Sequence, residues 1–328
     1  MSTVGTWFER RSFHHGSYAD AGALAEAKDA RGVTMTLVLP TRNVAGTIAP
    51  ILRIVAQLNR RPAPLVDEVL VVDADSMDET ELIAADLGAT VYSENSLMPQ
   101  FGKALGKGDA MWRSLSVARG DIVMFADSDS KEFPPHFIVG VLGALLEPGV
   151  GFVKAGYRRP FVQAGRSIAD GGGRVTELLA KPLLNLLFPP LAGFVQPLAG
   201  EFAASRELFS SIPFFTGYGV EAGILIDALD ELGLDAMAQV DLGERLNQHQ
   251  ELADLGRMSH SVLRAVLQRA SARGNGPHPA GSAFAGTTMD YFHAVSSPEG
   301  FLLEEFGEEL VERPAMKTAL SRTTTPDN

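Results

Sequence analysis

Asp127 and Asp129, which flank Ser128, follow an almost unbroken apolar run from Ile122 to Ala126. The run is short and rich in β-formers, so it predicts a buried strand of a parallel sheet. The two aspartates would then lie at the carboxyl end of that strand, where open α/β sheets bind their ligands. Carboxylates so close together can share one hard cation, such as Mg²⁺ or Mn²⁺ beside a substrate phosphate. Because the same pattern also occurs in turns and helix caps, the rest of the chain has to support this interpretation.

Two glycine-rich segments contain cations and could bind an anion. Gly106-Lys107-Gly108 leads into a predicted helix, and its lysine is well placed to meet a phosphate or pyrophosphate, although the spacing is not that of a Walker A loop. Gly171-Gly172-Gly173 precedes Arg174 and Thr176 at the start of another predicted helix. Backbone N–H groups beside these side chains suit a phosphate or a carboxylate. The alternative for both segments is a flexible surface turn; for the second, the sequence favours anion binding.

Polar residues also follow two earlier strands of the predicted sheet. Asp73, Asp75 and Ser76 come directly after one of them and can either cap the next helix or bind a nucleobase or ribose. Thr41-Arg42-Asn43 comes after the other and can cap the helix that follows it. A strand–turn–helix start of this kind presents N–H groups to an anion, but it is also simply the first unit of any doubly wound sheet.

Several polar residues later in the chain could serve a sugar or a metal. Glu221 follows the glycine-rich loop that begins at Thr216, and it could accept hydrogen bonds from sugar hydroxyls. Glu201 is expected to enter a helix, where it could be an ordinary first-turn acid. The end of a later strand is followed by Arg245, Asn247 and His249. A lone histidine is usually structural or exposed, but this one could join the aspartate site as a metal ligand.

The elements that must position these residues alternate along the chain. Strands are expected over residues 34–39, 68–72, 89–92, 122–126, 151–156 and 234–242, and helices over residues 21–30, 44–58, 109–117, 134–146, 176–187, 222–229 and 251–273. This alternation predicts an α/β fold with a mostly parallel sheet and right-handed crossovers. Residues 273–286 are expected to form a loop, and residues 321–328 a disordered tail.

Composition limits the classes of partner. The chain has 328 residues, 45% of them hydrophobic, and a net charge of −12. Such an acidic chain argues against general binding to nucleic acid or anionic membranes, although a local basic pocket could still bind an anionic substrate. The lack of cysteine excludes disulfides, thiolate catalysis and cysteine zinc sites. No apolar stretch is long enough to span a bilayer and the N-terminus has no apolar signal core, so we expect a cytoplasmic protein.

Together these motifs resemble the actinobacterial glucosyl-3-phosphoglycerate synthases and the related mannosyl-3-phosphoglycerate synthases, which are retaining GT-A glycosyltransferases. The similarity extends over nearly the whole chain after Gly32. It rests on the following stretches, in this order: Leu39-Pro40-Thr41-Arg42-Asn43, Val72-Asp73-Ala74-Asp75-Ser76, Gly106 to Ser114, Asp127-Ser128-Asp129, Gly171 to Glu177, Gln196 to Glu201 and Gly217 to Glu221. The resemblance implies a Rossmann-like GT-A sheet with helices on both faces. We expect an N-terminal leader with one helix (1–32), followed by a nucleotide-sugar-binding half (33–160), an acceptor-binding and dimerisation part (161–312) and a C-terminal tail (313–328).

The resemblance further implies a nucleotide-sugar donor and 3-phospho-D-glycerate as the acceptor. Donor binding would involve Pro40, Thr41, Arg42, Asn43, Val44, Asp73, Asp75, Ser76, Lys107, Asp127, Ser128, Tyr218, Gly219, Val220, Glu221 and Arg245. The acceptor would be held by Gly173, Arg174, Val175, Thr176 and Asn247. Asp129 and His249 would bind Mg²⁺ or Mn²⁺, and catalysis would depend on Asp129, Glu221, Arg245 and Lys107.

One stretch departs from the glucosyl enzymes. In those enzymes a His-x-Asn order follows the arginine, with the histidine on the metal and the asparagine on the acceptor, whereas this chain has Asn247-Gln248-His249. We expect His249 to supply the metal ligand from its shifted position. Pro-Thr-Arg-Asn also replaces the Pro-Ala-Leu-Asn of the glucosyl enzymes at residues 40–43. Both differences favour the mannosyl branch and leave the donor open between GDP-mannose, GDP-glucose and UDP-glucose.

The implied reaction transfers a hexosyl group to the C2 hydroxyl of 3-phospho-D-glycerate with retention of the α configuration. No carboxylate stands out as a nucleophile, so we expect a front-face substitution in which a diphosphate oxygen accepts the proton of the acceptor. One alternative is a polyprenyl-phosphate glycosyltransferase, which predicts a membrane-associated segment. A second is a nucleotide-sugar-binding protein without turnover, and a third is a sugar nucleotidyltransferase, which needs a nucleoside triphosphate. The resemblance also implies a homodimer.

Overall fold

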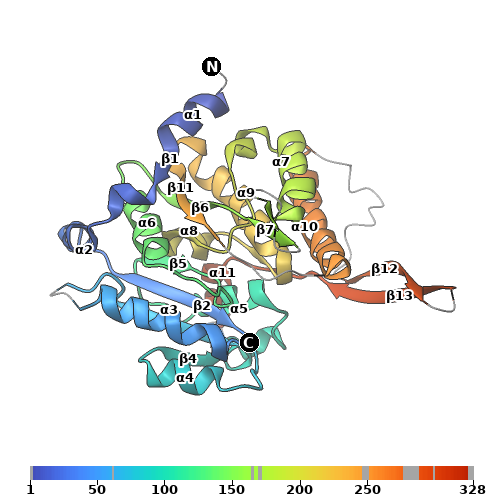
Figure 1. Ribbon diagram of the computed structural model, residues 1–328, viewed down its shortest axis with the longest axis horizontal. Coiled ribbons are helices and arrows are strands. Elements are labelled where there is room, and N and C mark those ends of the chain that lie inside the picture. The colour runs from blue at the N-terminus through green and yellow to red at the C-terminus, as the bar shows by residue number, and fades with distance from the viewer. Residues whose placement is uncertain are drawn as a thin grey trace.

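A computed structural model describes residues 3–60, 63–163, 166–168, 172–245, 251–275, 288–297 and 300–323. Its core is an eight-stranded sheet with the strand order β1-β11-β6-β9-β5-β2-β3-β4 (Figure 1). The strands are β1 (Ser12–His14), β2 (Met35–Thr41), β3 (Glu68–Asp73), β4 (Thr90–Ser93), β5 (Ile122–Phe125), β6 (Phe152–Arg158), β9 (Phe202–Ser205) and β11 (Met237–Glu244). All neighbours pair in parallel except β9, which is antiparallel to both β5 and β6. The predicted, mostly parallel α/β sheet is confirmed.

Helices cover both faces of this sheet. One apolar layer contains side chains of α2 (Ala21–Ala30), α3 (Ala45–Leu58), α4 (Thr80–Asp86) and α6 (His136–Leu145). The opposite layer contains side chains of α1 (Thr3–Arg11), α5 (Lys107–Ser114), α7 (Lys181–Leu187), α8 (Arg206–Ser211), α9 (Val220–Leu232), α10 (Leu252–Ala272) and α11 (Met316–Thr323). Leu37 and Leu39 of β2 face the first layer and Val38 faces the second, because successive side chains of a strand point to opposite faces. Both faces are therefore apolar, which accounts for the continuous hydrophobic runs in the sequence.

The chain after Glu201 forms a strand, so the helix predicted there is wrong. Phe202, Ala203 and Ala204 are buried in β9, between β5 and β6. The helix begins only at Arg206, where the Ser205 side chain caps it by accepting a hydrogen bond from the Leu208 amide at 3.1 Å. Because β9 runs against its neighbours, its first residue lies at the edge where they end. Glu201 is thereby brought to the predicted site.

The N-terminal residues are packed into the domain. Trp7 of α1 is buried, and its Nε1 donates a hydrogen bond to the Met237 carbonyl at 2.8 Å. β1 then pairs with β11 and extends the central sheet by one strand. One helix was expected before residue 32; the structure has α1, β1 and α2 there.

The chain after residue 287 contains a long hairpin that the sequence analysis did not predict. Its strands, β12 (Thr288–Ser297) and β13 (Gly300–Glu309), project from the body of the molecule (Figure 1). The chain then returns through β14 (Glu312–Arg313), which pairs with β10 (Phe214–Phe215), and ends in α11. A third small pair joins β7 (Phe161–Gln163) to β8 (Arg166–Ile168). Most of the loop expected over residues 273–286 and the last residues of the expected tail lie outside the described residues. In the described part of the chain, no helix is long and apolar enough to cross a bilayer.

Candidate active site

The carboxylate of Asp127 lies between two cations. Its Oδ1 accepts a hydrogen bond from Lys107 Nζ at 2.5 Å, and its Oδ2 accepts one from Arg245 Nη2 at 3.0 Å. Asp127 follows β5, Arg245 follows β11 and Lys107 begins α5, so three separate segments meet at the carboxyl edge of the sheet. Sequence analysis placed all three residues in the site, and the structure brings them together.

Two glutamates and a tyrosine complete this arrangement. Glu221, near the start of α9, accepts a hydrogen bond from Lys107 Nζ at 2.6 Å. Glu201 accepts two from Arg245 Nη1, at 2.6 and 2.7 Å. The Tyr157 hydroxyl donates to Glu201 at 3.1 Å and accepts from Arg245 at 3.0 Å. We call the set Lys107, Asp127, Tyr157, Glu201, Glu221 and Arg245 the edge network.

Burial and pairing act on the edge network in opposite directions. Burial alone would raise the pKa of Asp127, but Lys107 and Arg245 outweigh it and hold that pKa well below its usual range. Burial would likewise lower the pKa of Lys107, whereas Asp127 and Glu221 raise it. At Glu201 burial prevails and raises the pKa of the carboxyl group, although Arg245 opposes the rise. Lys107 and Arg245 therefore stay protonated, and each is ion-paired to two carboxylates of the edge network.

Glycine and a buried lysine bring the segment before β9 close to Asp127. A Cβ atom on Gly200 would lie 2.2 Å from Asp127 Oδ1, so only glycine allows this approach. Lys154 of β6 is fully buried and donates a hydrogen bond to the Ala199 carbonyl at 2.9 Å. Its Nζ also lies 4.4 Å from the centre of the Phe202 ring. Burial lowers the pKa of Lys154 to about 7, and the amine fixes the segment through its hydrogen bond to a backbone carbonyl.

The C-terminal part of the chain holds α5 in place. Asp109 is fully buried and accepts hydrogen bonds from Arg313 Nε at 2.9 Å and Arg313 Nη2 at 2.6 Å. Trp112 Nε1 donates to the Pro314 carbonyl at 2.7 Å. A Cβ atom on Gly108 would lie 2.0 Å from the Phe215 carbonyl oxygen, so α5 also packs directly on β10. Lys107, at the start of α5, is thereby held towards Asp127.

The loop that ends at Gly106 meets the loop that carries Tyr218. Gly106 and Gly217 both have positive φ, +80° and +63°, which glycine adopts without strain. The Gly217 amide donates a hydrogen bond to the Leu105 carbonyl at 3.1 Å. Tyr218 is 47% exposed, Gly219 and Val220 are buried, and Glu221 follows them into the edge network. Of these four predicted donor-binding residues, Glu221 contacts Lys107 directly.

The residues predicted to hold a nucleoside form one hydrogen-bonded edge. Asp73 is fully buried and accepts hydrogen bonds from Thr41 Oγ1 at 2.8 Å and from Ser76 Oγ at 2.6 Å. Ser76 Oγ in turn accepts from the Asn43 amide at 2.8 Å. Buried Asp73 therefore fixes the loop after β2 and the loop after β3 relative to each other. Arg42 and Asp75 are the exposed charged residues of this edge.

The first predicted loop is also joined to Ser128. Ser128 Oγ donates a hydrogen bond to the Pro40 carbonyl at 2.5 Å, and the Ser128 carbonyl accepts one from Thr47 Oγ1 at 2.7 Å. The Val44 amide donates to Thr80 Oγ1 at 2.9 Å. The nucleoside edge and the Asp127–Asp129 segment therefore form one continuous surface at the ends of β2, β3 and β5.

The predicted anion-binding loop lies at the start of α7. Gly173 has a φ of +67°, and Val175 and Thr176 are buried where a single π-helical turn, Thr176–Ala180, leads into the helix. A Cβ atom on Gly172 would lie 2.7 Å from the Arg159 carbonyl oxygen, so the loop rests directly on the chain that leaves β6. Arg174, which precedes this turn, is half-buried. Gly171 and Asn247 lie outside the described residues.

Asp129 is the exposed acid of the site. Its side chain is 73% accessible, and Arg245 Nη2 lies 3.7 Å from its Oδ1. A carboxylate of this kind fits one ligand of Mg²⁺ or Mn²⁺, which takes its remaining oxygens from water and substrate phosphates. Within the described ranges no group of three or more His, Cys, Asp or Glu side chains could hold a metal. His249, the second predicted ligand, lies outside them.

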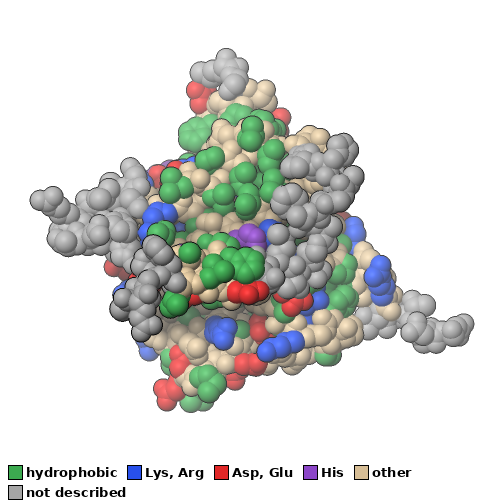
Figure 2. Space-filling view, turned by 90° about the vertical axis from the view of Figure 1, so that its right-hand side faces the viewer, with side chains coloured by type: hydrophobic (Ala, Val, Ile, Leu, Met, Phe, Trp, Pro, Cys, Tyr) green, Lys and Arg blue, Asp and Glu red, His purple; other side chains and the backbone are tan. Residues whose placement is uncertain are grey.

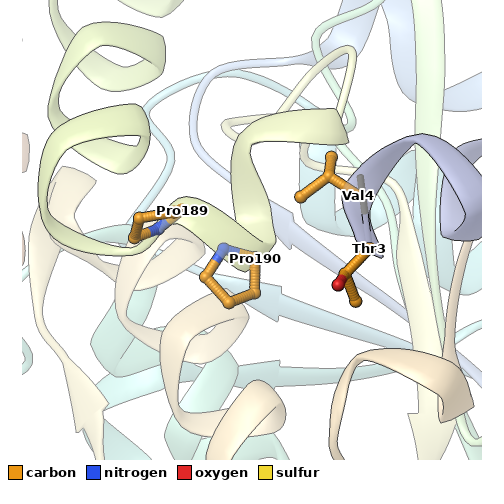
Figure 3. Close-up of a pocket in the computed structure, with 4 residues that line it drawn as sticks. All are labelled: Thr3, Val4, Pro189 and Pro190. Carbon is orange, nitrogen blue, oxygen red and sulfur yellow. The ribbon is translucent and has the colours of Figure 1, made fainter. Parts of the chain in front are cut away.

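A surface pocket elsewhere does not belong to this site. Thr3 and Val4 of α1 face Pro189 and Pro190 across it (Figure 3). None of these residues carries a charge, and none is part of the edge network.

Sequence reasoning missed three contributors to the site. Tyr157 and Lys154 lie in β6, where a lysine inside the apolar run Phe152-Val153-Lys154-Ala155 was a usable signal, because buried lysines need a specific partner. The Asp109–Arg313 pair joins residues 204 positions apart, and no pattern near either residue in the sequence predicts it. Glu201 was noticed but assigned to a helix.

Comparison with known proteins identifies the family of this chain. Residues 36–207 match the family model described as glycosyl transferase family 2. The chain is 41% identical over 324 residues to the glucosyl-3-phosphoglycerate synthase of Mycolicibacterium paratuberculosis, covering 97% of this chain and 93% of that protein. Among solved structures, mannosyl-3-phosphoglycerate synthase from Rubrobacter xylanophilus is 55% identical with a TM-score of 0.88, covering 97% of this chain and 98% of that one. The glucosyl-3-phosphoglycerate synthase of Mycobacterium tuberculosis, solved with Mn²⁺, UDP-glucose and phosphoglyceric acid, is 40% identical with a TM-score of 0.75, covering 91% and 94%.

The chain therefore belongs to glycosyl transferase family 2. Within that family it belongs with the glucosyl- and mannosyl-3-phosphoglycerate synthases, as the sequence motifs implied.

Proposed function

We propose that this protein transfers a hexosyl group from a nucleotide sugar to the C2 hydroxyl of 3-phospho-D-glycerate, with retention of the α configuration. The observation that carries the proposal is the position of Lys107 and Arg245 on either side of Asp127. These cations lie at the sheet edge to which the nucleoside loops and Asp129 also belong. The M. tuberculosis relative, solved with UDP-glucose and phosphoglyceric acid, supports this choice of substrates.

In this reaction the bond between the anomeric carbon and the diphosphate oxygen breaks, and its electron pair stays with the diphosphate. Lys107 and Arg245 stabilise the negative charge that develops there, in a site where buried charges act strongly. Asp129, with His249 as the second ligand implied by the family, would hold Mg²⁺ or Mn²⁺, which supplies further positive charge to the diphosphate. The C2 oxygen then bonds to the anomeric carbon on the same face, and its proton passes to the released diphosphate oxygen.

The edge network supports a front-face route without a covalent intermediate. Asp127, Glu201 and Glu221 are each ion-paired, to Lys107, Arg245 or both. A carboxylate held between cations is a weak nucleophile, because its charge is already neutralised. Glu221 instead lies beside the exposed Tyr218 loop, where it can accept hydrogen bonds from hexose hydroxyls.

The donor is proposed to be GDP-mannose. The R. xylanophilus mannosyl enzyme is 55% identical to this chain, whereas the M. tuberculosis glucosyl enzyme is 40% identical. The Pro40-Thr41-Arg42-Asn43 loop, which differs from that of the glucosyl enzymes, lies at the nucleoside edge. Glucosyl transfer from UDP-glucose or GDP-glucose is the second candidate, because the curated relatives are named glucosyl-3-phosphoglycerate synthases.

Purified protein should therefore be incubated with Mg²⁺, 3-phospho-D-glycerate and each of GDP-mannose, GDP-glucose and UDP-glucose in separate reactions. A hexosyl-phosphoglycerate product from any donor supports the class, and the donor with the highest kcat/KM identifies the enzyme. Binding of a donor without product from any of the three would contradict the acceptor assignment.

We further propose a cytoplasmic homodimer. The β12–β13 hairpin leaves the body of the molecule and exposes Phe292, Leu302 and Leu303, which are 54%, 57% and 68% accessible. Figure 2 shows the side of the molecule from which the hairpin projects; a further group of hydrophobic side chains gathers in its upper centre, above the level of the hairpin. Such exposed apolar groups are typical of surfaces that a partner covers. Light scattering after gel filtration tests this, and a monomeric mass at micromolar concentration would contradict it.

A further inference from the structure

Arg159 lies against the predicted anion-binding loop. It directly follows β6, and its carbonyl oxygen accepts a hydrogen bond from the Gly172 amide at 2.9 Å. A Cβ atom on Gly172 would lie 2.8 Å from Arg159 Cβ, and a Cβ atom on Gly173 would lie 3.3 Å from Arg159 Cδ. The two glycines therefore give the loop room for this side chain, and Gly173 also needs its φ of +67°. The Arg159 side chain lies along the same glycines that were predicted to receive an anion.

The guanidinium of Arg159 has an N–H group without a hydrogen-bond partner among the described residues. Its Nη2 donates a hydrogen bond to the Tyr157 hydroxyl at 3.0 Å. The group without a partner in the described part of the chain is the buried Nε. A guanidinium offers five N–H donors in a planar fork that matches carboxylate and phosphate oxygens. A buried N–H group of a charged side chain left without a partner is costly, so an oxyanion that accepts from Arg159 would satisfy it.

Tyr157 connects Arg159 to the donor side of the site. Its hydroxyl accepts from Arg159 at 3.0 Å and from Arg245 at 3.0 Å, and it donates to Glu201 at 3.1 Å. The Arg159 guanidinium carbon also lies 5.2 Å from the centre of the Tyr157 ring, and that of Arg245 lies 5.4 Å from it. One tyrosine thus holds a cation of the loop and a cation of the edge network at a fixed separation.

We propose that Arg159 is an acceptor-binding residue that donates hydrogen bonds to an oxyanion of the acceptor, together with the Gly172–Thr176 loop. The inference rests on the proposed function, because that function supplies an acceptor with two anionic groups, a phosphate and a carboxylate. Tyr157 positions Arg159, and through it the acceptor, relative to Arg245 and the leaving diphosphate. Arg159 would therefore raise the rate of hexosyl transfer by orienting the acceptor, and would take no part in bond making or breaking.

Arg159→Gln and Arg159→Lys test the proposal, with Arg158→Gln as the matched control. Arg158 is the preceding residue, its side chain is 53% exposed, and its Nε lies 3.7 Å from Glu244. Each Gln variant removes one positive charge at nearly the same place in the sequence. Initial rates should be measured over both substrate concentrations, and 3-phospho-D-glycerate binding by calorimetry in the presence of nucleoside diphosphate and Mg²⁺.

The Arg159→Gln variant is expected to raise the KM and the Kd for 3-phospho-D-glycerate by about tenfold or more, with the donor KM within about twofold of wild type. Arg159→Lys is expected to recover part of the affinity, and Arg158→Gln to match wild type. Equal losses for donor and acceptor, or an unchanged acceptor Kd, overturn the proposal. Calorimetry with D-glycerate and with glycerol 3-phosphate then separates the two oxyanions. The variant loses affinity only for the probe that keeps the group bound by Arg159.

Failure of the proposed function gives a different pattern. In that case wild type forms no hexosyl product and binds no 3-phospho-D-glycerate, whereas failure of the Arg159 inference leaves both intact in wild type and in Arg159→Gln.

Discussion

Glu201 and Arg245 form a buried ion pair at the carboxyl edge of the sheet. One Arg245 nitrogen lies 2.6 and 2.7 Å from the two oxygens of Glu201, and neither side chain is more than 1% exposed. The other terminal nitrogen of Arg245 reaches Asp127 and Ser130, at 3.0 and 2.7 Å. Glu201 therefore fixes the orientation in which Arg245 meets the substrate side of the site, although Glu201 itself is closed to substrate.

Glu201→Gln should reduce both stability and turnover. Glutamine keeps the shape but removes the charge that compensates buried Arg245, and breaking one side of such a pair costs on the order of 3 kcal/mol. We expect kcat to fall about hundredfold, since a misplaced Arg245 stabilises the departing diphosphate less well. Chemical denaturation and steady-state kinetics measure both effects. Asp254→Asn is the control: it breaks an exposed pair with Arg257 and should change the free energy of unfolding by less than about 1 kcal/mol. Wild-type kinetics in Glu201→Gln would contradict the claim that Glu201 orients Arg245 for catalysis.

Gly200→Ala should disturb Asp127 directly. The new methyl group would lie 2.2 to 2.4 Å from the Asp127 carboxylate, so either the aspartate or the chain before β9 must move. We expect a loss of about 1–3 kcal/mol in the free energy of unfolding, and a lower kcat because Lys107 and Arg245 lose their common partner. Gly46→Ala serves as the control, because nothing lies within 4 Å of a Cβ atom there and alanine favours the surrounding helix α3. Equal stability of the two variants would contradict the packing argument.

Glu94 should make the stability of the fold depend on pH. Burial, followed by the charges of Asp109 and Asp75, raises the pKa of Glu94 to about 7 from an ordinary 4.5. Below pH 4.5 the group is protonated in both the folded and the unfolded chain, so it has no effect there. Between pH 4.5 and about 7 the unfolded chain has released this proton while the folded chain still holds it, so stability falls as pH rises and the loss is complete above pH 7.

Glu94→Gln should remove this loss. Its free energy of unfolding should exceed that of wild type by about 2 kcal/mol at pH 8, and the difference should disappear near pH 4. Denaturation curves at several pH values provide the measurement. A difference that does not change with pH would show that Glu94 titrates normally in the folded protein.

Asp129→Asn should weaken metal binding without unfolding the site. The Asp129 side chain is 73% exposed and its nearest cation, Arg245, lies 3.7 Å away, so stability should change little. We expect kcat at saturating substrates to fall at least about hundredfold, and the Mn²⁺ affinity measured with bound nucleoside diphosphate to fall in parallel. Glu132→Gln, at an exposed acid three residues on, is the control. Unchanged Mn²⁺ affinity in Asp129→Asn would exclude Asp129 as a ligand.

Short-range patterns were sufficient to predict much of this structure. The apolar run before Asp127 and the glycines around Lys107 placed both residues correctly, because each signal lies within a few residues of its element. The strand at Phe202 was missed because its four residues are no more β-forming than helix-forming, and only pairing with β5 and β6 decides their conformation. The remaining contacts could not be predicted because they join residues far apart in the sequence. Arg313 contacts Asp109, which is 204 positions away in the sequence. Tyr157 lies in β6, whereas its partners Glu201 and Arg245 lie next to the ends of β9 and β11.

The most direct test of the proposed reaction is the NMR spectrum of the product made from GDP-mannose and 3-phospho-D-glycerate. We predict a single mannosyl-phosphoglycerate, with an α anomeric signal and a through-bond correlation from the anomeric carbon to C2 of the glycerate. A β-linked product, a linkage to the carboxylate or phosphate, or release of free mannose alone would contradict retaining transfer to the C2 hydroxyl.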